Sequence, residues 1–259
     1  MNNKNRRNII IDIVNDLDEV SINLLGKKFG VSKSTIYRDL ILLDKQGQLK
    51  KTTRGAIKIE EFLIEKDSYF ANGLKIKNAE KRAIAIKALD YIGSDESIIL
   101  DAGTANFLLA KEIKNSDLWD LTVITNNIIT QLLLVKNRNL RVVAPGGLIM
   151  EGCYSALGDF LGDMLKNISA NIAFITTKGI SLDGSISEFE YSESKIKQLF
   201  LQKSRKKILM FNSTKFGRMG IYKVANLTDF DVIITDSGIT KEHLEVLKKT
   251  GVKLEIVKA

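Results

Sequence analysis

The sequence predicts two domains: a small N-terminal domain with a winged helix-turn-helix, and a larger C-terminal α/β domain with a mainly parallel, Rossmann-like sheet. Three observations predict this organisation. Positive charge is concentrated in the first quarter of the chain, two short capped helices follow each other there, and β-rich runs alternate with helical stretches from residue 97 onward. We place the first domain at 1–58, a linker at 59–77 and the second domain at 78–259.

Composition places the chain among ordinary globular proteins of the cytoplasm. It has 259 residues, of which 44% are hydrophobic and 27% charged, and no apolar run approaches the ~20 residues of a membrane span. The N-terminal MNNKNRRNIIIDIVNDLDEV has early acids and no small-residue cleavage site, so we do not interpret it as a signal peptide. Cys153 is the single cysteine and His243 the single histidine, so neither a disulfide within the chain nor a Cys/His metal site is expected, and no cofactor is implied.

The net charge of +8 is unevenly distributed. Residues 1–58 contain 12 Lys and Arg against 6 Asp and Glu, whereas residues 59–259 contain 27 against 25. A local basic excess is typical of a surface that binds a polyanion such as DNA, although a solvated lysine-rich surface would have the same composition.

The first domain begins with an amphipathic pattern from Arg6 to Leu17, and a short capping pattern then occurs twice. Ser21 in VSINLL and Ser32 in VSKSTI each follow a valine and precede an apolar residue placed to close a hydrophobic staple. The first short helix is expected at 22–29, and Gly30 supplies the turn because glycine tolerates positive φ. A short helix, a glycine turn and a second capped helix form a helix-turn-helix.

The second of these helices has one apolar face and one polar flank. Ile36, Leu40 and Leu43 lie at i, i+4 and i+7 and are expected to face the core. Because the N-terminal part of the second helix enters the major groove in this motif, its polar residues are candidates for contact with bases and phosphates. These candidates are Ser32, Lys33, Ser34, Thr35, Tyr37 and Arg38; for Arg38 the alternative is a surface ion pair.

A basic hairpin is expected directly after this helix. Gly47 ends the helix, and residues 49–52 and 56–59 are short candidate strands. The hairpin has Lys50, Lys51 and Arg54, which a wing would place along the sugar-phosphate backbone. The alternative is an ordinary charged hairpin.

The second domain is expected to start with a helix at 78–92 and to continue as alternating strands and helices. The candidate strands are 97–101, 121–125, 140–144, 172–176, 207–211, 231–235 and 253–257, and the candidate helices are 106–114, 127–136, 157–168, 192–204 and 241–249. Strands that alternate with helices predict a mainly parallel sheet covered on both faces.

Polar motifs follow several of these strands, where ligands bind in parallel sheets. DAGTAN (101–106) has a glycine next to a helix start, which suits an anion but matches neither common nucleotide loop, and a plain turn remains an alternative. TNN (125–127), PGG (145–147) and NSTKFG (212–217) follow three further strands. Lys215 in the last motif is placed to meet a phosphate, or else is simply solvated.

The segment GKKFGVSKSTIYRDLILLDKQGQLKKTTRGA resembles the DNA-binding domain of DeoR-type bacterial regulators. LDAGTA, VITNN, the GG pair and NSTKFG resemble, in this order, the effector domain of the same family, so the resemblance covers nearly the whole chain. It implies a repressor, less often an activator, of a sugar-metabolism operon, with an effector domain related to ribose-5-phosphate isomerase that senses a phosphorylated sugar or related metabolite. The effector-site candidates are Asp101, Gly103, Thr104, Asn106, Thr125, Asn126, Gly147, Lys178 and Lys215.

The chain departs from the family pattern at four places. Tyr37 stands where an arginine is usual, and the wing has one glycine, Gly55, where two are common. Lys178 in TTKGI replaces a small or acidic polar residue, and Asn212 replaces an aspartate. The last two changes make the pocket more positive, so we expect either a more acidic effector or a site that no longer binds the family ligand.

Two other functions stay open at this point. One is a ligand-independent DNA-binding regulator with a degenerate pocket. The other is an isomerase-like enzyme, which would need a carboxylate as its base. The candidate bases are Asp101, Glu188, Glu190 and Glu193. His243 is expected on the surface or on one face of a helix and not in a catalytic role. We predict no catalytic residues.

A homo-oligomer is expected, because one helix-turn-helix covers about one half-site of an operator. Aromatic residues that would pack between subunits, or else inside one domain, are Phe62, Tyr69, Phe70 and Trp119.

Overall fold

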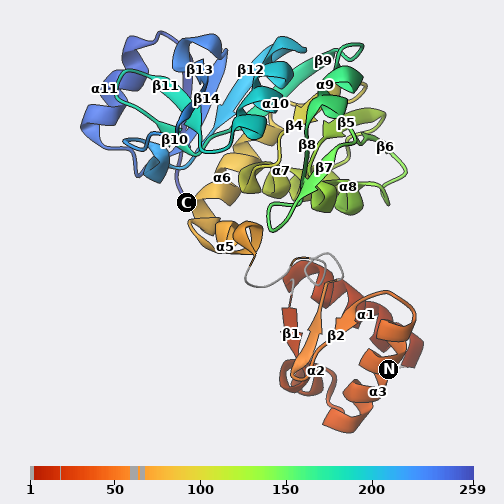
Figure 1. Ribbon diagram of the computed structural model, residues 1–259. Coiled ribbons are helices and arrows are strands. Elements are labelled where there is room, and N and C mark those ends of the chain that lie inside the picture. Colours follow the sequence, from red (N-terminus) through yellow and green to blue (C-terminus); the bar gives the residue numbers. More distant parts are fainter. Residues whose placement is uncertain (1–2, 18, 59–63, 65–67) are drawn as a thin grey trace. The chain divides into compact units, whose positions relative to one another are not determined.

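A computed structural model describes residues 3–17, 19–58, 64 and 68–259 (Figure 1). The chain separates into two compact units, Met1–Glu65 and Lys66–Ala259. The expected linker at 59–77 spans this division. Its residues 59–63 and 65–67 lie outside the described residues, and its C-terminal part forms a helix, α5 (Tyr69–Lys75), that belongs to the second unit.

The first unit contains three helices and a small sheet. In chain order the elements are α1 (Asn3–Leu17), β1 (Glu19–Ser21), α2 (Ile22–Phe29), α3 (Lys33–Lys45), β2 (Lys50–Lys51) and β3 (Gly55–Ile57). The three predicted helices and the hairpin are confirmed, although Ile59 of the expected second strand lies outside the described residues. Strand β1 was not predicted; it pairs antiparallel with β3, so the wing is part of a three-stranded sheet in the order β1-β3-β2.

Both predicted caps are present. The side-chain oxygen of Ser21 accepts a hydrogen bond from Leu24 N at 3.2 Å, and that of Ser32 accepts one from Thr35 N at 3.2 Å. Gly30 ends α2 with φ of 63°. Such caps stabilise a helix end by about 1 kcal/mol each. Gly30 and the Ser32 cap together account for the sharp turn that separates α2 from α3.

The apolar face of α3 anchors the first unit. Ile36, Leu40 and Leu43 are buried, as predicted, and pack with apolar side chains of α1, α2 and the sheet. Burying a side chain of this size contributes about 1.5–3 kcal/mol. Because one face is fixed in this way, the opposite flank of α3 must face solvent.

The second unit is built on a seven-stranded sheet. Its strands are β4 (Ser97–Leu100), β5 (Leu121–Thr125), β6 (Leu140–Val143), β9 (Ala170–Thr176), β12 (Ser204–Met210), β14 (Val232–Asp236) and β15 (Lys253–Val257). They lie in the order β15-β14-β12-β9-β4-β5-β6, and every pair is parallel. All seven predicted strands are therefore confirmed.

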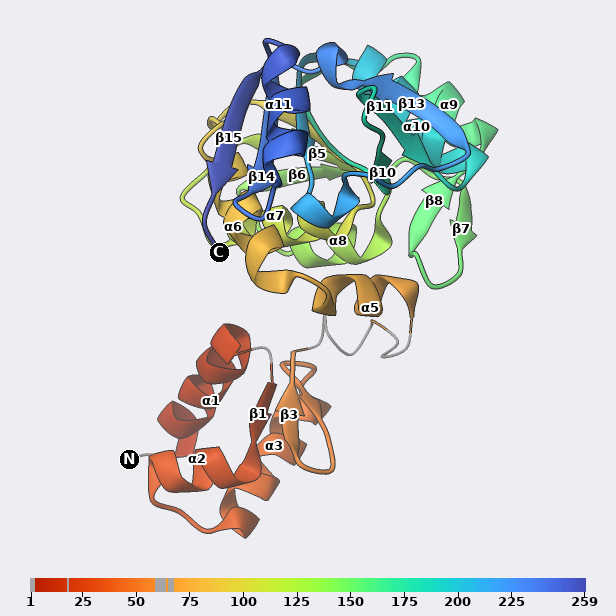
Figure 2. The ribbon, with the colours of Figure 1, turned by 90° about the vertical axis from the view of Figure 1, so that its left-hand side faces the viewer.

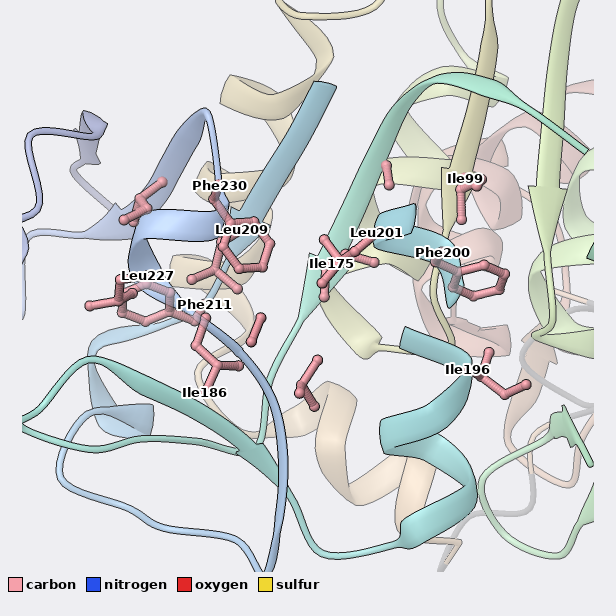
Figure 3. Close-up of a cluster of buried hydrophobic side chains, with 14 of the residues drawn as sticks. Ile99, Ile175, Ile186, Ile196, Phe200, Leu201, Leu209, Phe211, Leu227 and Phe230 are labelled. Carbon is pink, nitrogen blue, oxygen red and sulfur yellow. The ribbon is translucent and has the colours of Figure 1, made fainter. Parts of the chain in front are cut away.

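Helices cover both faces of this sheet (Figure 1). One layer contains α6 (Asn78–Leu89), α7 (Thr104–Lys114) and α8 (Ile128–Leu134), and the other contains α9 (Asp159–Leu165), α10 (Tyr191–Gln202) and α11 (Lys241–Lys249). Figure 3 shows the core under the second layer, where Phe200 and Ile196 of α10 lie beside Ile99 and Ile175 of the sheet.

Several short elements were not predicted. Strands β7 (Leu148–Met150) and β8 (Ser155–Leu157) form an antiparallel hairpin, visible at the right of Figure 2. Strands β10 (Gly179–Ile180), β11 (Ser185–Glu188) and β13 (Tyr222–Asn226) form a small antiparallel sheet, and two 3₁₀ turns, η1 (Ser213–Lys215) and η2 (Leu227–Asp229), complete the unit. These elements are two or three residues long or, like SISE in β11 and YKVAN in β13, contain no run of apolar residues such as the strands of the large sheet have.

The strand order has one switch point. The chain builds β4, β5 and β6 toward one edge and then returns to place β9 on the other side of β4. Loops after β4 and β9 therefore leave the sheet on opposite sides, and a crevice opens between them at the carboxyl ends of the strands. This is the position at which the fold favours a ligand site.

Candidate functional site

The first candidate surface is the exposed flank of α3. Lys33, Ser34, Tyr37 and Arg38 are exposed at its N-terminal half. Ser32, by contrast, is engaged in capping, and its hydroxyl lies 2.8 Å from that of Ser34 and 2.9 Å from that of Thr35. Within the described residues no acid is paired with Arg38, so its guanidinium is available to a ligand.

The wing is joined to α3 through an aromatic contact. The Lys51 ammonium lies 4.3 Å from the centroid of the Tyr37 ring, and Lys50 lies 3.4 Å from Asp44 at the end of α3. Arg54 is exposed at the tip of the hairpin. Tyr37 therefore bridges helix and wing, with the Lys51 ammonium over its ring.

Asp39, another residue of the family pattern, has a structural role. Its carboxylate accepts a bond of 2.7 Å from Arg6 Nε, and both side chains are buried. Removing one member of such a pair leaves an uncompensated buried charge. The Arg6–Asp39 pair thus holds α1 against α3 and leaves the exposed flank of α3 free.

The second candidate site is a pocket at the carboxyl ends of β12, β9, β4 and β5, at the switch point of the sheet. It encloses about 630 Å³ of space, including its open mouth. Five of the predicted effector residues line it, namely Gly103, Thr104, Asn126, Lys178 and Lys215. Further polar residues line it that we did not include in the predicted set, namely Lys81, Thr176, Thr177, Glu193, Lys197 and Asn212.

The other four predicted effector residues are placed elsewhere. Asp101, Asn106 and Thr125 are buried and hydrogen-bonded inside the unit. Gly147 lies at the start of the β7–β8 hairpin, where an added Cβ would lie 2.4 Å from Leu157 O. The reason is that β6, which PGG follows, is the edge strand of the sheet, so the loop after β6 leads away from the switch point.

Asp101 holds the pocket wall together. Its carboxylate accepts hydrogen bonds from Gly103 N at 2.9 Å, Asn106 Nδ2 at 2.8 Å and Thr176 N at 2.7 Å. It therefore ties the loop after β4 to the end of β9. Gly103 is needed for this close approach, since an added Cβ would lie 2.0 Å from Thr176 Oγ1.

A buried ion cluster lies beneath the pocket. Lys197 Nζ lies 2.6 Å from Glu188 Oε1 and 3.1 Å from Asp101 Oδ2, and it donates to Thr176 O at 2.7 Å. Burial opposes the charge of Lys197, but the two carboxylates outweigh it and raise the pKa of the ammonium. Burial also raises the pKa of Glu188, whose Oε2 has no partner among the described residues. With one ammonium against two carboxylates, the cluster supplies no positive charge to a ligand in the pocket.

Three other lysines supply the positive charge of the pocket. Burial, with the nearby charges of Lys215 and Lys178, lowers the pKa of Lys81 to about 8. Burial, with the charges of Lys178 and Arg218, lowers the pKa of Lys215 to about 8. Because Lys81, Lys178 and Lys215 line the same pocket, they can act together on one anion.

The remaining wall is suited to hydroxyl groups. Asn126 Nδ2 donates to Ala156 O at 3.0 Å, while its buried Oδ1 is without a partner among the described residues. Burial by itself would lower the pKa of Lys178. Nearby groups, with the negative charge of Glu193 first among them, outweigh burial and raise this pKa. The pocket thus combines cations, one lining carboxylate and a buried acceptor oxygen.

The free N–H groups at the start of α7 add to the anion site. Gly103 precedes the helix without a side-chain cap, and Thr104 is the first helical residue. The first N–H groups of a helix and its dipole favour an anion. Asn212, where the family usually has aspartate, keeps the facing loop in place because its Oδ1 accepts hydrogen bonds from Thr214 N and Thr214 Oγ1.

A sequence signal for Lys81 and Lys197 did exist. On α6 the buried residues are Lys81, Ile84, Ala85 and Ala88, so this lysine lies on the apolar face of its helix. Lys197 likewise lies among the buried residues of α10. A lysine at an apolar position of a helix is rarely buried without a partner, and both residues point to a polar site.

The candidates for catalysis are distributed differently. Glu188 is buried in the ion cluster, Glu190 is exposed, and Glu193 lines the pocket. His243 is half-buried, and its ring stacks on Phe216 at 4.4 Å, so it is not simply on a helix surface.

Within the described ranges, no group of three or more metal-ligating side chains was found, and no helix is long and apolar enough to cross a membrane.

A winged helix-turn-helix joined to a pocket-bearing α/β unit defines a transcriptional regulator with a sensor domain, and comparison with known proteins agrees. A DeoR-like helix-turn-helix domain matches residues 6–62, and a DeoR C terminal sensor domain matches residues 76–237. The chain belongs to the DeoR family of helix-turn-helix transcriptional regulators.

Full-length relatives are similar over almost the whole chain. The uncharacterized HTH-type transcriptional regulator YulB of Bacillus subtilis (strain 168) is 31% identical, over 97% of this chain and 96% of the relative. The glycerol-3-phosphate regulon repressor of Escherichia coli (strain K12) is 26% identical, over 99% of this chain and all of the relative (100%). Among solved structures, ribose 5-phosphate isomerase from Plasmodium falciparum matches with a TM-score of 0.39 and 21% identity over 52% of each chain, which is too low to establish a common fold.

Proposed function

We propose that this regulator represses a sugar-metabolism operon and that a phosphorylated sugar or related metabolite in the pocket controls its affinity for the operator. The observation that carries the proposal is the charge of the pocket. Lys81, Lys178 and Lys215 face a single lining carboxylate, Glu193. The ion cluster below has one carboxylate more than it has cations, and the three lysines still leave the pocket positive when that carboxylate is counted. A positive pocket suits a phosphate monoester, whose charge is about −1.5 to −2 at pH 7.

The rest of the pocket supports a sugar rather than a bare anion. Asn126 Oδ1 is a buried acceptor without a partner in the described structure, and a ligand hydroxyl would satisfy it. Relatives named as repressors of the glycerol-3-phosphate regulon and, putatively, of the aga operon support a link to sugar metabolism. A more acidic effector than a monophosphate would need a further cation, so the monophosphate is the better match.

On DNA, the exposed residues of α3 would enter the major groove and the wing would contact the backbone. The contacts to operator DNA are assigned to Lys33, Ser34, Tyr37, Arg38, Lys50, Lys51 and Arg54, with Ser32 and Thr35 at the start of the helix. Because one helix-turn-helix reads one half-site, we infer a homo-oligomer with two-fold symmetry that acts in the cytoplasm.

The aromatic candidates for the subunit interface differ in their exposure. Trp119 is 59% exposed and Tyr69 is 57% exposed, so both are accessible on the isolated chain. Phe70 is buried against Phe107 and packs inside its own unit. Phe62 lies outside the described residues.

A sensor fits the pocket better than an isomerase does. Glu188 is already bonded to Lys197, and His243 is stacked on Phe216. Glu193 is the carboxylate that remains at the wall, and the relatives that match almost the whole chain are named as transcriptional regulators. An assay of sugar-phosphate isomerisation should therefore detect no turnover above that of a Glu193→Gln control.

The decisive experiment is fluorescence anisotropy with the upstream promoter DNA of the protein's own gene, at fixed salt, with and without a panel of sugar phosphates. Specific binding that one metabolite changes supports the proposal and identifies the effector. Specific binding that is indifferent to every metabolite would instead favour a ligand-independent regulator. Equal binding to a scrambled duplex would refute sequence-specific recognition.

Lys178 allows a second test of the effector's charge. Lys178→Asp should weaken binding of the effector found in that screen, because it removes one cation and adds an anion to the wall. Unchanged affinity for all sugar phosphates of the panel would show that Lys178 does not face the ligand.

A further inference from the structure

Helix α5 contacts the pocket at three points, and each contact involves a lining residue. Lys81 Nζ donates hydrogen bonds to Gly73 O and, at 2.8 Å, to Ile76 O at the C-terminal end of α5. The Lys178 ammonium lies 4.4 Å from the centroid of the Tyr69 ring at the other end of the helix. Between them, Gly73 lies so close to Thr104 that an added Cβ would be 3.0 Å from its Cγ2.

The two lysines therefore each serve two partners. Both line the pocket, and both hold α5, which packs along the lower edge of the second unit in Figure 2. Lys81 is only 6% exposed, and its bonded partners on α5 are neutral carbonyl groups. A phosphate is a stronger acceptor for an ammonium than a neutral carbonyl, so an anion in the pocket competes with α5 for these donors.

The two ends of α5 are held differently. Its beginning is anchored independently of the lysines, since Phe70 N donates to Gly152 O at 2.9 Å and the Phe70 ring packs edge-on against Phe107 at 5.5 Å. Its last turn is held by Lys81 and also by Asn78, whose Nδ2 donates to Leu74 O at 2.9 Å. Loss of the Lys81 bonds would therefore loosen the C-terminal turn and leave the start of the helix in place.

The position of α5 in the chain makes such a change relevant to regulation. Glu65 is the last residue of the first unit, and Tyr69, the first residue of α5, follows after three residues. Of the two lysine contacts, that of Lys178 with Tyr69 lies at the end of α5 next to this short segment, so its release is the change that acts toward the DNA-binding unit.

We propose that Lys81 and Lys178 are shared between the bound anion and α5, which makes α5 the element of the sensor unit that responds when the pocket is filled. The inference rests on the proposed function, because it takes the pocket to be an anion site. It adds Lys81 as a ligand-binding residue. It also assigns a role to Tyr69, which is outside the pocket wall and competes with the bound anion for the Lys178 ammonium.

The first test is amide hydrogen exchange on the full-length chain, with inorganic phosphate as the probe and chloride at equal ionic strength as the control. Phosphate should slow exchange in residues 103–108, at the start of α7. It should also speed exchange in residues 72–77 by about tenfold, the equivalent of one charge-assisted hydrogen bond. Slower exchange at 103–108 with no change at 72–77 would overturn the inference and leave the anion site standing. No change in either segment would refute the anion site itself, and the inference with it.

The second test uses Tyr69→Ala with Tyr191→Ala as the matched control. The two tyrosines are 57% and 55% exposed, and Tyr191 also lies under a lysine, Lys195, at 5.3 Å. Removing Tyr69 releases Lys178, so phosphate should bind about two- to fivefold more tightly, in line with a cation–π contact of about 0.5–1 kcal/mol. General damage would weaken binding instead. Unchanged or weaker phosphate binding in Tyr69→Ala, relative to Tyr191→Ala, would refute the role of Tyr69.

Discussion

Effector binding should weaken steeply as the pH rises above 8. Without an anion, burial and neighbouring charges lower the pKa of both Lys81 and Lys215 to about 8, from 10.5 for an exposed lysine. A bound phosphate favours the charged form and raises both values again. Below pH 8 the two ammonium groups are largely present before binding, and above it each must first gain a proton.

The magnitude follows from proton linkage. Affinity should fall by up to about tenfold per pH unit above 8 for each lysine that must be protonated, so by up to about a hundredfold when both take part. At pH 8 each lysine is about half protonated, and binding should take up about one proton in total. Below about pH 6 the affinity should fall again, because the phosphate loses its second charge.

The assay is isothermal titration calorimetry with the effector identified by the anisotropy screen, from pH 6 to 9.5 at constant ionic strength. Two buffers of different ionisation enthalpy count the protons. Lys215→Met should reduce the uptake to that of one lysine, whereas Lys241→Met, which removes an exposed lysine of α11, should change nothing. A flat affinity between pH 7 and 9.5 without proton uptake would refute the assignment of both lysines.

Three further predictions concern recognition and stability. Arg38→Ala should weaken operator binding by about 1–3 kcal/mol and relax specificity at one base pair in anisotropy titrations; an equal loss on operator and scrambled DNA would contradict base recognition. Gly103→Ala should destabilise the second unit by about 1–3 kcal/mol in urea unfolding, because its Cβ would overlap Thr176; wild-type stability would mean that the wall yields easily. Lys197→Met should cost about 3–5 kcal/mol by leaving two buried carboxylates uncompensated. Lys195→Met, on the exposed face of the same helix, should cost less than about 0.5 kcal/mol, and equal effects would refute the role of the ion cluster.

Much of the fold could be predicted from local signals. The helix-turn-helix follows from the Ser32 cap, the glycine turn and the spacing of Ile36, Leu40 and Leu43, all of which are encoded within about fifteen residues. The seven parallel strands follow from apolar runs that are long enough to show their pattern. Strands β1, β7 and β8 are three residues long and exist because of their pairing partners, which no local pattern reveals.

The candidate site was predictable only in outline. The sequence by itself determined which polar residues follow the strands, and hence that a ligand site lies at the carboxyl edge of the sheet. The tertiary structure decided which of them face the pocket. The Asp101 side chain is buried because Thr176 at the end of β9 and Lys197 of α10 bind its carboxylate. These two residues are about 75 and 96 positions away from Asp101 in the sequence. Lys81 reaches the pocket from a helix and not from a strand end, because the packing of α6 on the sheet and α5 holds it there. Such placement depends on how distant elements pack. A local pattern marks Lys81 as a lysine on an apolar helix face but does not tell which pocket it lines.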